Sequence, residues 1–271
     1  MSEPISVPRG TTSLAGERWP GPGPVAVLLH AGVADRRSWY SVAGQLSGHA
    51  TVVAYDRRGF GETPPGIGPF SHLDDLLALL DYLELSEVWL VGSSVGGKLA
   101  LDAALVAPER VSGLVLLAPG VSGAPAPDEE GLEPQLLWLD QQIEQQVDLG
   151  NLDEVNRLET WLWLDGPSGP EGRVSGAARN LALDMNLVVL SYDGSEGSDE
   201  NVNAWERLED LSVPTTVAWG SLDVGFLIAK SQALAARIPG AKYRCLEGLA
   251  HLPYLEDPSA VAAIVIDALA T

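Results

Sequence analysis

The 271-residue sequence contains a single cysteine, Cys245, and only four histidines. One cysteine can form neither an internal disulfide nor a cluster of cysteine metal ligands, so a reducing compartment is the expected setting. Cys245 lies in KYRCLEG, a predicted strand, where we expect it to be a small buried hydrophobic residue and not a reactive thiol. We predict no metal site and no cofactor.

Basic residues are also scarce, since 16 Lys and Arg stand against 37 Asp and Glu, giving a formal net charge of −21. Such a charge repels phosphate backbones and anionic lipids, which argues against nucleic acid or membrane partners. No apolar run approaches the roughly 20 residues that span a bilayer. The N-terminal MSEPISVPRG lacks the basic-then-apolar pattern of a secretory signal. We therefore expect a cytoplasmic protein, monomeric or homodimeric, whose partner is a small molecule.

Short apolar runs alternate with amphipathic helical patterns in two blocks of the sequence. Continuous apolar runs such as Val25–Leu29 are typical of strands buried on both faces of a parallel sheet. Repeated strand-then-helix units imply a doubly wound, mostly parallel α/β sheet. The predicted strands are 25–29, 51–55, 88–91, 114–117, 215–219 and 243–246, and the predicted helices of the two blocks are 36–46, one from Ser71 to 83, one ending before Pro108, 226–237 and one opened by Asp257.

The segment between the two blocks has a different composition. The proline-rich GVSGAPAP is a predicted linker, and three helical patterns follow it. We therefore divide the chain into a core of residues 1–123 and 211–271 and a helical insertion, 124–210, that lies over the sheet. The acidic loop YDGSEGSDEN within the insertion lacks the ligand spacing of a calcium loop and is predicted to be solvated.

The stretch LVGSSVGGKLAL places Gly92 and Gly96 on either side of Ser94, where a predicted strand ends and a helix begins. This G-x-S-x-G pattern is weak alone, but a strand before it and a helix after it match a nucleophile elbow. In that sharp turn, small neighbours avoid clashes with the adjacent strand and helix. A frame centred on Ser93 would put valines at both glycine positions. Ser94 is therefore the predicted nucleophile.

A serine hydroxyl needs a base to remove its proton, and a carboxylate to orient that base. Only His251, in GLAHLPYLEDP, lies on the loop after the last predicted strand, where such a base is expected. Asp223 directly follows the preceding strand, TTVAWGS. His49 and His72 are expected to be ordinary surface or core residues. The order Ser94, Asp223, His251, each after a strand, predicts a catalytic triad.

An oxyanion hole needs two preorganised donors. One should be the backbone N–H of Val95, the residue after the nucleophile. The second should come from the loop His30-Ala31-Gly32-Val33 after the first predicted strand, and we choose the N–H of Gly32, with Val33 as the alternative. His30 is expected to brace this loop.

Five motifs in this order resemble the α/β-hydrolase superfamily: LLHAGVADRRSW, YDRRGFGET, VGSSVGG, WGSLD and GLAHLPYLEDP. The resemblance covers roughly residues 25–120 and 213–270, and it implies the α/β-hydrolase fold with the insertion as a helical cap. Ala31 departs from the pattern, because many members have glycine there. Small-molecule esterases and enol-lactonases are the most similar subgroups. Dehalogenases and epoxide hydrolases of this fold have aspartate at the elbow, so Ser94 favours attack on a carbonyl carbon.

The predicted function is hydrolysis of a small or medium carboxylic ester or lactone through an acyl-enzyme. The same triad could serve a C–C bond hydrolase, a thioesterase or a cofactor-free perhydrolase, and a ligand-binding sensor with negligible turnover is a further alternative. Because Trp161 and Trp163 are two positions apart, only one of them can face the substrate from a helix. Arg157, Arg173 and Arg179 could bind a substrate carboxylate or belong to solvated faces. The predicted pocket residues are Val33, Trp138, Trp161 and Met185.

Overall fold

The computed structural model describes residues 1–127, 132–192 and 202–271, and within them an eight-stranded sheet has the order β1-β2-β4-β3-β5-β6-β7-β8. Neighbouring strands from β4 to β8 pair in parallel, whereas β2 is antiparallel to both β1 and β4. The predicted doubly wound, mostly parallel sheet is confirmed. The strands are β1 Glu3–Arg9, β2 Thr12–Trp19, β3 Val25–Leu29, β4 Thr51–Tyr55, β5 Val88–Ser93, β6 Val111–Leu117, β7 Thr215–Gly220 and β8 Lys242–Leu246.

The sequence prediction missed the hairpin of β1 and β2 at the edge of the sheet. Its strands are largely exposed or half-buried, so they lack the continuous apolar runs that mark the central strands. The turn between them contains Gly10 at φ +59°, in the left-handed region that glycine adopts readily. The predicted solvated loop lies almost wholly outside the described residues, which omit 193–201.

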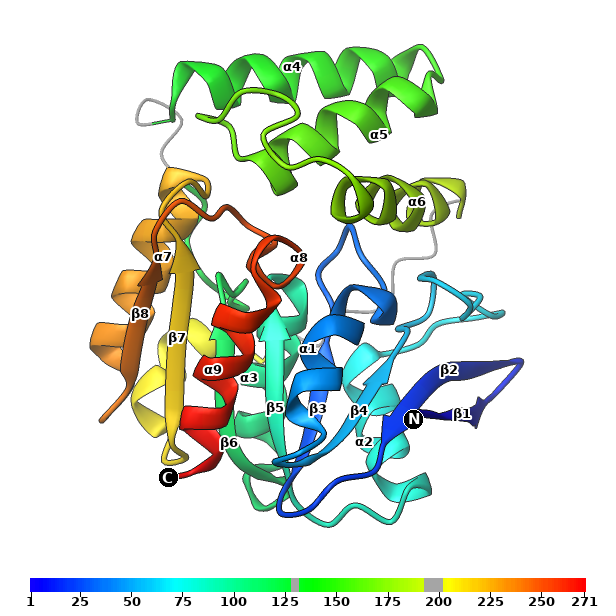
Figure 1. Cartoon of the computed structure of the whole chain (residues 1–271), viewed down its shortest axis with the longest axis vertical. Helices are drawn as coiled ribbons and strands as arrows, with labels where there is room; N and C mark the ends of the chain where they lie inside the picture. The colour runs from blue at the N-terminus through cyan, green and yellow to red at the C-terminus, as the bar shows by residue number, and fades with distance from the viewer. Residues whose placement is uncertain (128–131, 193–201) are drawn as a thin grey trace.

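Helices cover both faces of the sheet (Figure 1). Along β3, Ala26 and Leu28 pack in one apolar cluster with α1 and α9, and Val27 and Leu29 pack in another with α2 and α3. This alternation explains why the strand is apolar at every position. The helices are α1 Tyr40–Leu46, α2 His72–Tyr82, α3 Val95–Val106, α4 Pro134–Asp148, α5 Leu152–Thr160, α6 Ala177–Ser191, α7 Gly225–Arg237, α8 Pro253–Glu256 and α9 Pro258–Leu269.

Two helices begin at the predicted residues, and each has a side-chain hydrogen bond that caps its first turn. The Ser71 hydroxyl accepts a hydrogen bond from the Asp74 N–H at 3.2 Å and begins α2. The Asp257 carboxylate accepts from the N–H groups of Ser259 and Ala260 and begins α9, with proline at the first helical position. Each such cap stabilises its helix by about 1 kcal/mol.

The helices α4, α5 and α6 lie above the carboxyl ends of the strands, between β6 and β7 in the chain (Figure 1). They fall within the segment 124–210 that we propose as the insertion. An apolar cluster joins α4, α5 and the turn after α5 to the start of α7 in the core through six buried side chains: Leu136, Leu139, Leu158, Leu162, Val224 and Leu227. Burial of this cluster, favourable by about 25 cal/mol per Å² of apolar surface, holds the insertion on the core.

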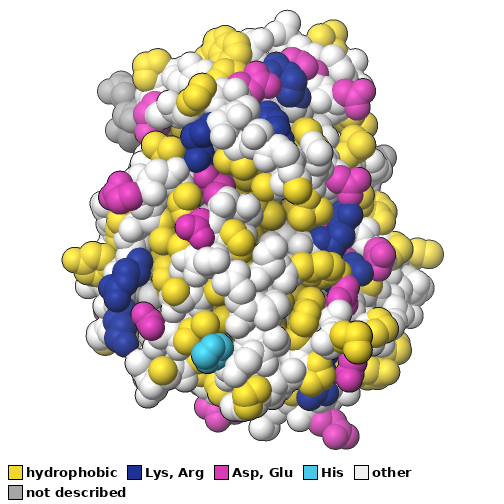
Figure 2. All heavy atoms as spheres, in the orientation of Figure 1, with side chains coloured by type: hydrophobic (Ala, Val, Ile, Leu, Met, Phe, Trp, Pro, Cys, Tyr) yellow, Lys and Arg dark blue, Asp and Glu magenta, His cyan; other side chains and the backbone are white. Residues whose placement is uncertain are grey.

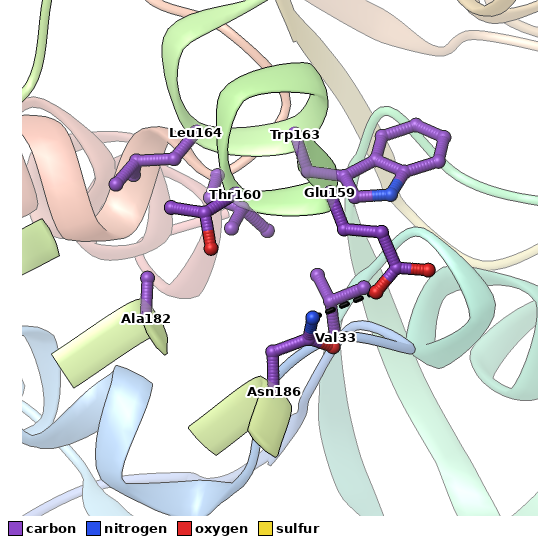
Figure 3. A pocket seen from close by; sticks show the side chains of 8 residues that line it. Val33, Glu159, Thr160, Trp163, Leu164, Ala182 and Asn186 are labelled. Carbon is purple, nitrogen blue, oxygen red and sulfur yellow. Dashed lines mark hydrogen bonds between the residues drawn. The ribbon is translucent and has the colours of Figure 1, made fainter. Parts of the chain in front are cut away.

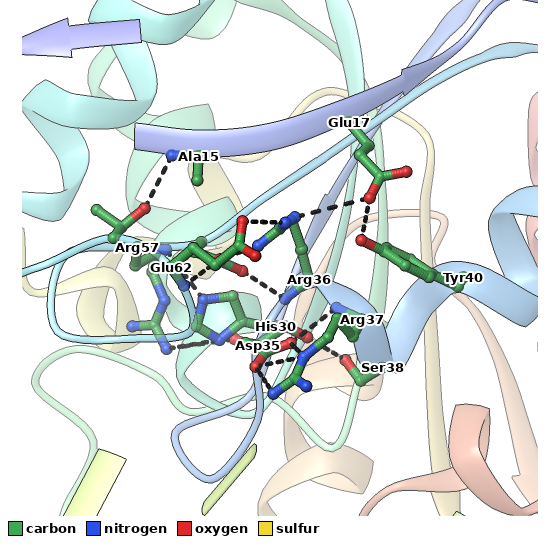
Figure 4. A network of polar contacts seen from close by, with 12 residues as sticks. Ala15, Glu17, His30, Asp35, Arg36, Arg37, Ser38, Tyr40, Arg57 and Glu62 are labelled. Carbon is green, nitrogen blue, oxygen red and sulfur yellow. Dashed lines mark hydrogen bonds and ion pairs between the residues drawn. The ribbon is translucent and has the colours of Figure 1, made fainter. Parts of the chain in front are cut away.

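The loop after β3 is fixed to the turn after β4 by a polar network that includes Arg36 and Glu62 (Figure 4). The buried carboxylate of Asp56 connects the two segments. It accepts hydrogen bonds from the N–H groups of Arg36 at 2.8 Å and Glu62 at 2.9 Å, and it pairs with the Arg36 guanidinium. Burial raises the pKa of the Asp56 carboxyl to about 6, although Arg36 opposes this shift. Gly61, at φ +51°, has room for no Cβ, since one would lie 2.3 Å from Asp56 Oδ2.

The prediction that Cys245 is buried is wrong. It lies on β8, the edge strand of the sheet, and is exposed. Its pKa is raised, first by partial desolvation and then by Glu247, so the thiol stays protonated at neutral pH. The expectation of an unreactive thiol therefore has a different physical basis from the one assumed.

The surface carries charges of both signs. On the face shown in Figure 2, Asp and Glu side chains are interspersed with Lys, Arg and apolar groups. The described side chains on this face therefore form no continuous basic surface of the kind that binds a polyanion. None of the helices in the described part of the chain combines the length and apolar character that a bilayer-spanning segment needs.

We predict that Gly61→Ala lowers the free energy of unfolding by about 2–4 kcal/mol, because it adds a Cβ in the left-handed region and displaces the Asp56 carboxylate. Gly44→Ala is the matched control. It lies in the exposed face of α1 with no atom near its Cβ position, and should raise stability by about 0.5–1 kcal/mol. Urea denaturation of both variants checks this, and equal stabilities would contradict the role of Asp56.

Candidate active site

The strand order reverses at the carboxyl ends of β3 and β5. From β3 the chain crosses to β4 on one side, and then returns to β5 on the other side of β3. Ligands of open α/β sheets bind where the strand order reverses in this way. Gly32 lies on the loop after β3 and Ser94 directly follows β5, so both lie at this edge of the sheet.

Ser94 adopts a strained backbone conformation between β5 and α3. Its φ is +53° and its ψ −118°, which for a non-glycine residue costs about 1–3 kcal/mol. Three backbone hydrogen bonds hold it there. Its N–H donates to the Leu117 carbonyl at 3.0 Å, and its carbonyl accepts from the N–H groups of Lys98 at 3.0 Å and Gly120 at 2.8 Å. The sharp turn expected of a nucleophile elbow is therefore present.

The steric reason predicted for the two flanking glycines is confirmed. A Cβ on Gly92 would lie 2.3 Å from the Gly96 carbonyl oxygen, and one on Gly96 would lie 2.3 Å from the Leu29 carbonyl oxygen. Gly97 is also required, because its Cβ would lie 2.6 Å from Pro119 Cβ. The start of α3 therefore packs directly against the backbone at the end of β3.

The structure brings Asp223 and His251 together. His251 Nδ1 lies 2.9 Å from Asp223 Oδ2 and 3.1 Å from Oδ1, and both side chains are buried. The carboxylate is itself fixed by the Val224 N–H at 2.7 Å. A proton on Nδ1 satisfies this carboxylate and leaves Nε2 as the basic nitrogen. In the described chain the Ser94 hydroxyl forms no hydrogen bond with His251; such bonds often tighten only when substrate binds.

The loop that carries His251 is held by the insertion. The Glu256 carboxylate accepts the Ala250 N–H at 2.7 Å and pairs with Arg173 at 2.5 Å. Arg173 also donates to the carbonyls of Asp165, at 2.7 Å, and Leu164, at 2.8 Å. The insertion therefore positions the residue next to His251.

The proposed role of three arginines as substrate ligands is not supported by their contacts. Arg157 pairs with Glu154 and Glu171. Arg173 pairs with Glu256, as above, and Arg179 pairs with the fully buried Asp165 at 2.6 Å. These arginines have carboxylate partners within the protein.

The loop after β3 presents backbone donors near Val95. An ideal Cβ on Gly32 would lie 3.6 Å from Val95 Cγ2, which shows how close the two segments approach. Within the described residues, neither the Gly32 N–H nor the Val95 N–H donates a hydrogen bond to the protein. Two N–H groups without protein acceptors at one edge of the sheet are what an oxyanion hole requires.

His30 braces this loop, as expected. Its ring is fully buried, with Nδ1 2.8 Å from the Ala31 carbonyl and Nε2 accepting the Arg57 N–H at 3.1 Å. Burial, aided by the positive charge of Arg57, holds the pKa of His30 well below its usual value. It therefore remains neutral at physiological pH and serves as a fixed hydrogen-bonding spacer.

A small cavity lies between the insertion and the core (Figure 3), and the empty space of about 180 Å³ at this place includes open solvent. Val33 and Leu252 reach it from the core loops that also carry Gly32 and His251. Trp163 lines it too, and its ring lies 4.8 Å from the His251 ring. The full lining is Val33, Glu159, Thr160, Trp163, Leu164, Ala182, Asn186 and Leu252.

Of the four predicted pocket residues, only Val33 lines this cavity. Met185 is fully buried in the core cluster. Trp138 and Trp161 pack edge to face at 5.8 Å, and the Trp161 indole N–H donates to the Gly169 carbonyl. Trp163 takes the place that the sequence argument gave to Trp161. Residues Trp161–Asp165 form a π-helical turn, and, as their two-residue spacing predicted, only one of the two tryptophans lines the cavity.

The model of the alpha/beta hydrolase family matches residues 26–264. The chain belongs to the alpha/beta hydrolase family. A pimeloyl-[acyl-carrier protein] methyl ester esterase of Aeromonas salmonicida is 26% identical over 268 residues, 93% of this chain and 98% of that protein. A 2-hydroxy-6-oxo-2,4-heptadienoate hydrolase of Pseudomonas putida is 46% identical over 110 residues, 38% of this chain and 40% of that protein. The structure of an N-acyl homoserine lactone degrading enzyme is 25% identical, with a TM-score of 0.71 over 96% of this chain and 98% of that one.

The resemblance to the superfamily and the predicted fold of this α/β-hydrolase are thus confirmed. The predicted class of reaction, hydrolysis of an ester or a lactone, agrees with the esterase and the lactone-degrading enzyme among these relatives.

We predict that Gly96→Ala in this α/β-hydrolase lowers kcat/KM for a p-nitrophenyl ester about 100-fold. The added Cβ pushes α3 away from the Leu29 carbonyl and displaces Ser94 and Val95 together. The assay is run where circular dichroism shows the variant folded, with Gly44→Ala as control. Wild-type activity in folded Gly96→Ala would show that the close approach of β3 and α3 does not matter.

Proposed function

We propose that this protein is a serine hydrolase that cleaves a small or medium carboxylic ester or lactone through an acyl-enzyme. Ser94 is the nucleophile, His251 the general base and Asp223 the residue that orients His251. The observation that carries the proposal is the strained Ser94 elbow at the same edge of the sheet as the buried Asp223–His251 pair.

The proposed reaction has two steps. In the first, Ser94 Oγ attacks the carbonyl carbon while His251 Nε2 takes its proton, and the proton then passes to the leaving alkoxide oxygen. In the second, His251 takes a proton from water, the resulting hydroxide attacks the acyl carbon, and Ser94 leaves with the proton returned. Asp223 stabilises the imidazolium that forms in each step.

The N–H groups of Val95 and Gly32 are the proposed oxyanion hole. Both lack protein acceptors in the described residues, and the substrate oxygen would complete their hydrogen bonding. Donors fixed in this way typically stabilise the transition state by about 3–4 kcal/mol each. Val95 is the first residue of α3, so the positive end of the helix dipole would also stabilise the negative charge on the substrate oxygen.

The setting of the enzyme is part of the same proposal. The single cysteine and the net charge of −21 support a cytoplasmic protein that acts on a small molecule, as a monomer or homodimer.

A second candidate is hydrolysis of a C–C bond beside a ketone. It is favoured by the 46% identity to a hydrolase whose named substrate carries an oxo group and no ester. The longer match, over 93% of this chain, is to an esterase, so ester hydrolysis is preferred. A panel of p-nitrophenyl esters, lactones and 2-hydroxy-6-oxo dienoates separates the two, because the preferred reaction should have the larger kcat/KM.

We predict that Ser94→Ala abolishes ester hydrolysis, with a loss of at least about 10⁴-fold, and abolishes labelling by a fluorophosphonate probe. Ser93→Ala is the matched control. Its side chain is fully buried and therefore out of reach of a substrate, so removal of its hydroxyl should leave most of the activity. Undiminished turnover by Ser94→Ala, or loss in Ser93→Ala alone, would refute the choice of nucleophile.

A second substitution tests the role of Asp223. We predict that Asp223→Asn keeps the fold but lowers kcat roughly 10³- to 10⁴-fold, because the amide cannot hold His251 with its proton on Nδ1. The change in kcat should far exceed that in KM. A steady-state comparison at constant pH measures both, and a kcat within tenfold of wild type would mean that Asp223 is only a structural partner.

A further inference from the structure

Two buried polar atoms of the cavity have no hydrogen-bond partner among the described residues. They are Oγ1 of Thr160, at the end of α5, and Oδ1 of Asn186, on α6. The residues are only 4% and 2% exposed, and both line the cavity (Figure 3). Because buried polar groups are almost always paired, these two atoms call for a partner that enters the cavity.

A short hydrogen-bond network decides which atom of Asn186 is left without a partner. Asn156 Nδ2 donates to the Leu183 backbone carbonyl at 2.9 Å, which turns Asn156 Oδ1 toward Asn186. Asn186 Nδ2 then donates both to Asn156 Oδ1 at 3.1 Å and to Glu159 Oε2 at 2.7 Å. Both amide donors are used, so Asn186 offers only its oxygen, an acceptor.

We propose that Thr160 and Asn186 form a substrate subsite that binds an uncharged amide or hydroxyl group of the ester or lactone. Asn186 Oδ1 requires a donor, and the Thr160 hydroxyl can donate to an acceptor, so the matching group carries both. A ketone lacks the donor and an ammonium lacks the acceptor. Glu159 is a positioning residue that orients Asn186.

The walls of the cavity support an uncharged ligand group. Five apolar side chains line it beside the polar pair: Val33, Trp163, Leu164, Ala182 and Leu252. An anionic group would lose its hydration there and would lie beside the Glu159 carboxyl, with no basic side chain in the lining to compensate it. Burial also raises the pKa of Glu159, against the effect of its hydrogen bond with Asn186, so the cavity disfavours charge on its own carboxyl too.

The position of the cavity connects this subsite with the proposed reaction, on which the inference rests. Leu252 follows His251, Val33 follows Gly32, and the Trp163 ring that lines the cavity lies 4.8 Å from the His251 ring. A group bound by Thr160 and Asn186 therefore belongs to a molecule that extends toward the proposed base and oxyanion hole. Binding of this group by Thr160 and Asn186 would favour esters that carry a matching substituent at a distance from the reacting carbonyl.

Thr160→Val tests the subsite, with Thr160→Ser as the matched control that keeps the hydroxyl. The substrates are pairs of p-nitrophenyl esters of equal heavy-atom number, the first being N-acetylglycinate and 4-methylpentanoate. Two further pairs add one and two methylenes before the ester carbonyl. For at least one pair, Thr160→Val should lower the ratio of kcat/KM for the amide ester to that for the alkyl ester by roughly two- to tenfold. Thr160→Ser should restore it.

The outcomes separate the subsite from the proposed function. Because the Thr160 hydroxyl has no protein partner, Thr160→Val should fold with an unchanged Tm. A ratio unchanged for all three pairs overturns the subsite, as expected if the two atoms only hold an ordered water. Hydrolysis of these esters by Ser94→Ala at the wild-type rate would instead defeat the proposed function.

Discussion

The position of the Ser94 hydroxyl depends on a backbone conformation that is unfavourable for any residue with a Cβ. Its φ of +53° is maintained because α3 begins in contact with the backbone of β3, at a distance that only glycine at 92 and 96 permits. Hydrogen bonds from Ser94 to Leu117 and from Gly120 to Ser94 then offset the strain. The same contact brings Val95 beside Gly32, so one packing arrangement positions both the proposed nucleophile and the two proposed oxyanion donors.

The proposed base is held by Asp223 on the loop after β7, and partly by the insertion. Asp223 fixes the ring of His251, and Glu256 fixes the Ala250 N–H while it pairs with Arg173 of the insertion. Trp163 of the insertion packs on the His251 ring. A helical segment that forms the roof of the cavity thus also supports the geometry beneath it, so substitutions in the insertion can change reactivity as well as specificity.

Sequence patterns predicted the parts of the fold in which the residue types of a short segment suit the position of that segment in the folded protein. Three features could be predicted because each depends on residues within one short segment. They are the apolar runs of the central strands, the helix caps of Ser71 and Asp257, and the glycines around Ser94. The edge strands were harder, since exposure removes the apolar run, and for this reason β1 and β2 were missed and Cys245 was wrongly expected to be buried. The pocket was not predicted because it depends on Thr160 and Asn186, which line one cavity only when α5 and α6 pack. The sequence of neither helix alone predicts that contact between α5 and α6.

The claim that Ser94 forms an acyl-enzyme is tested most directly by rapid acid quench of the wild-type enzyme with a p-nitrophenyl ester, followed by peptide mass mapping. We expect one acyl group per chain, on the peptide that contains Ser94, which appears with the burst of p-nitrophenol and decays at the turnover rate. An acyl group on another residue, or turnover with no covalent intermediate at any quench time, would contradict it.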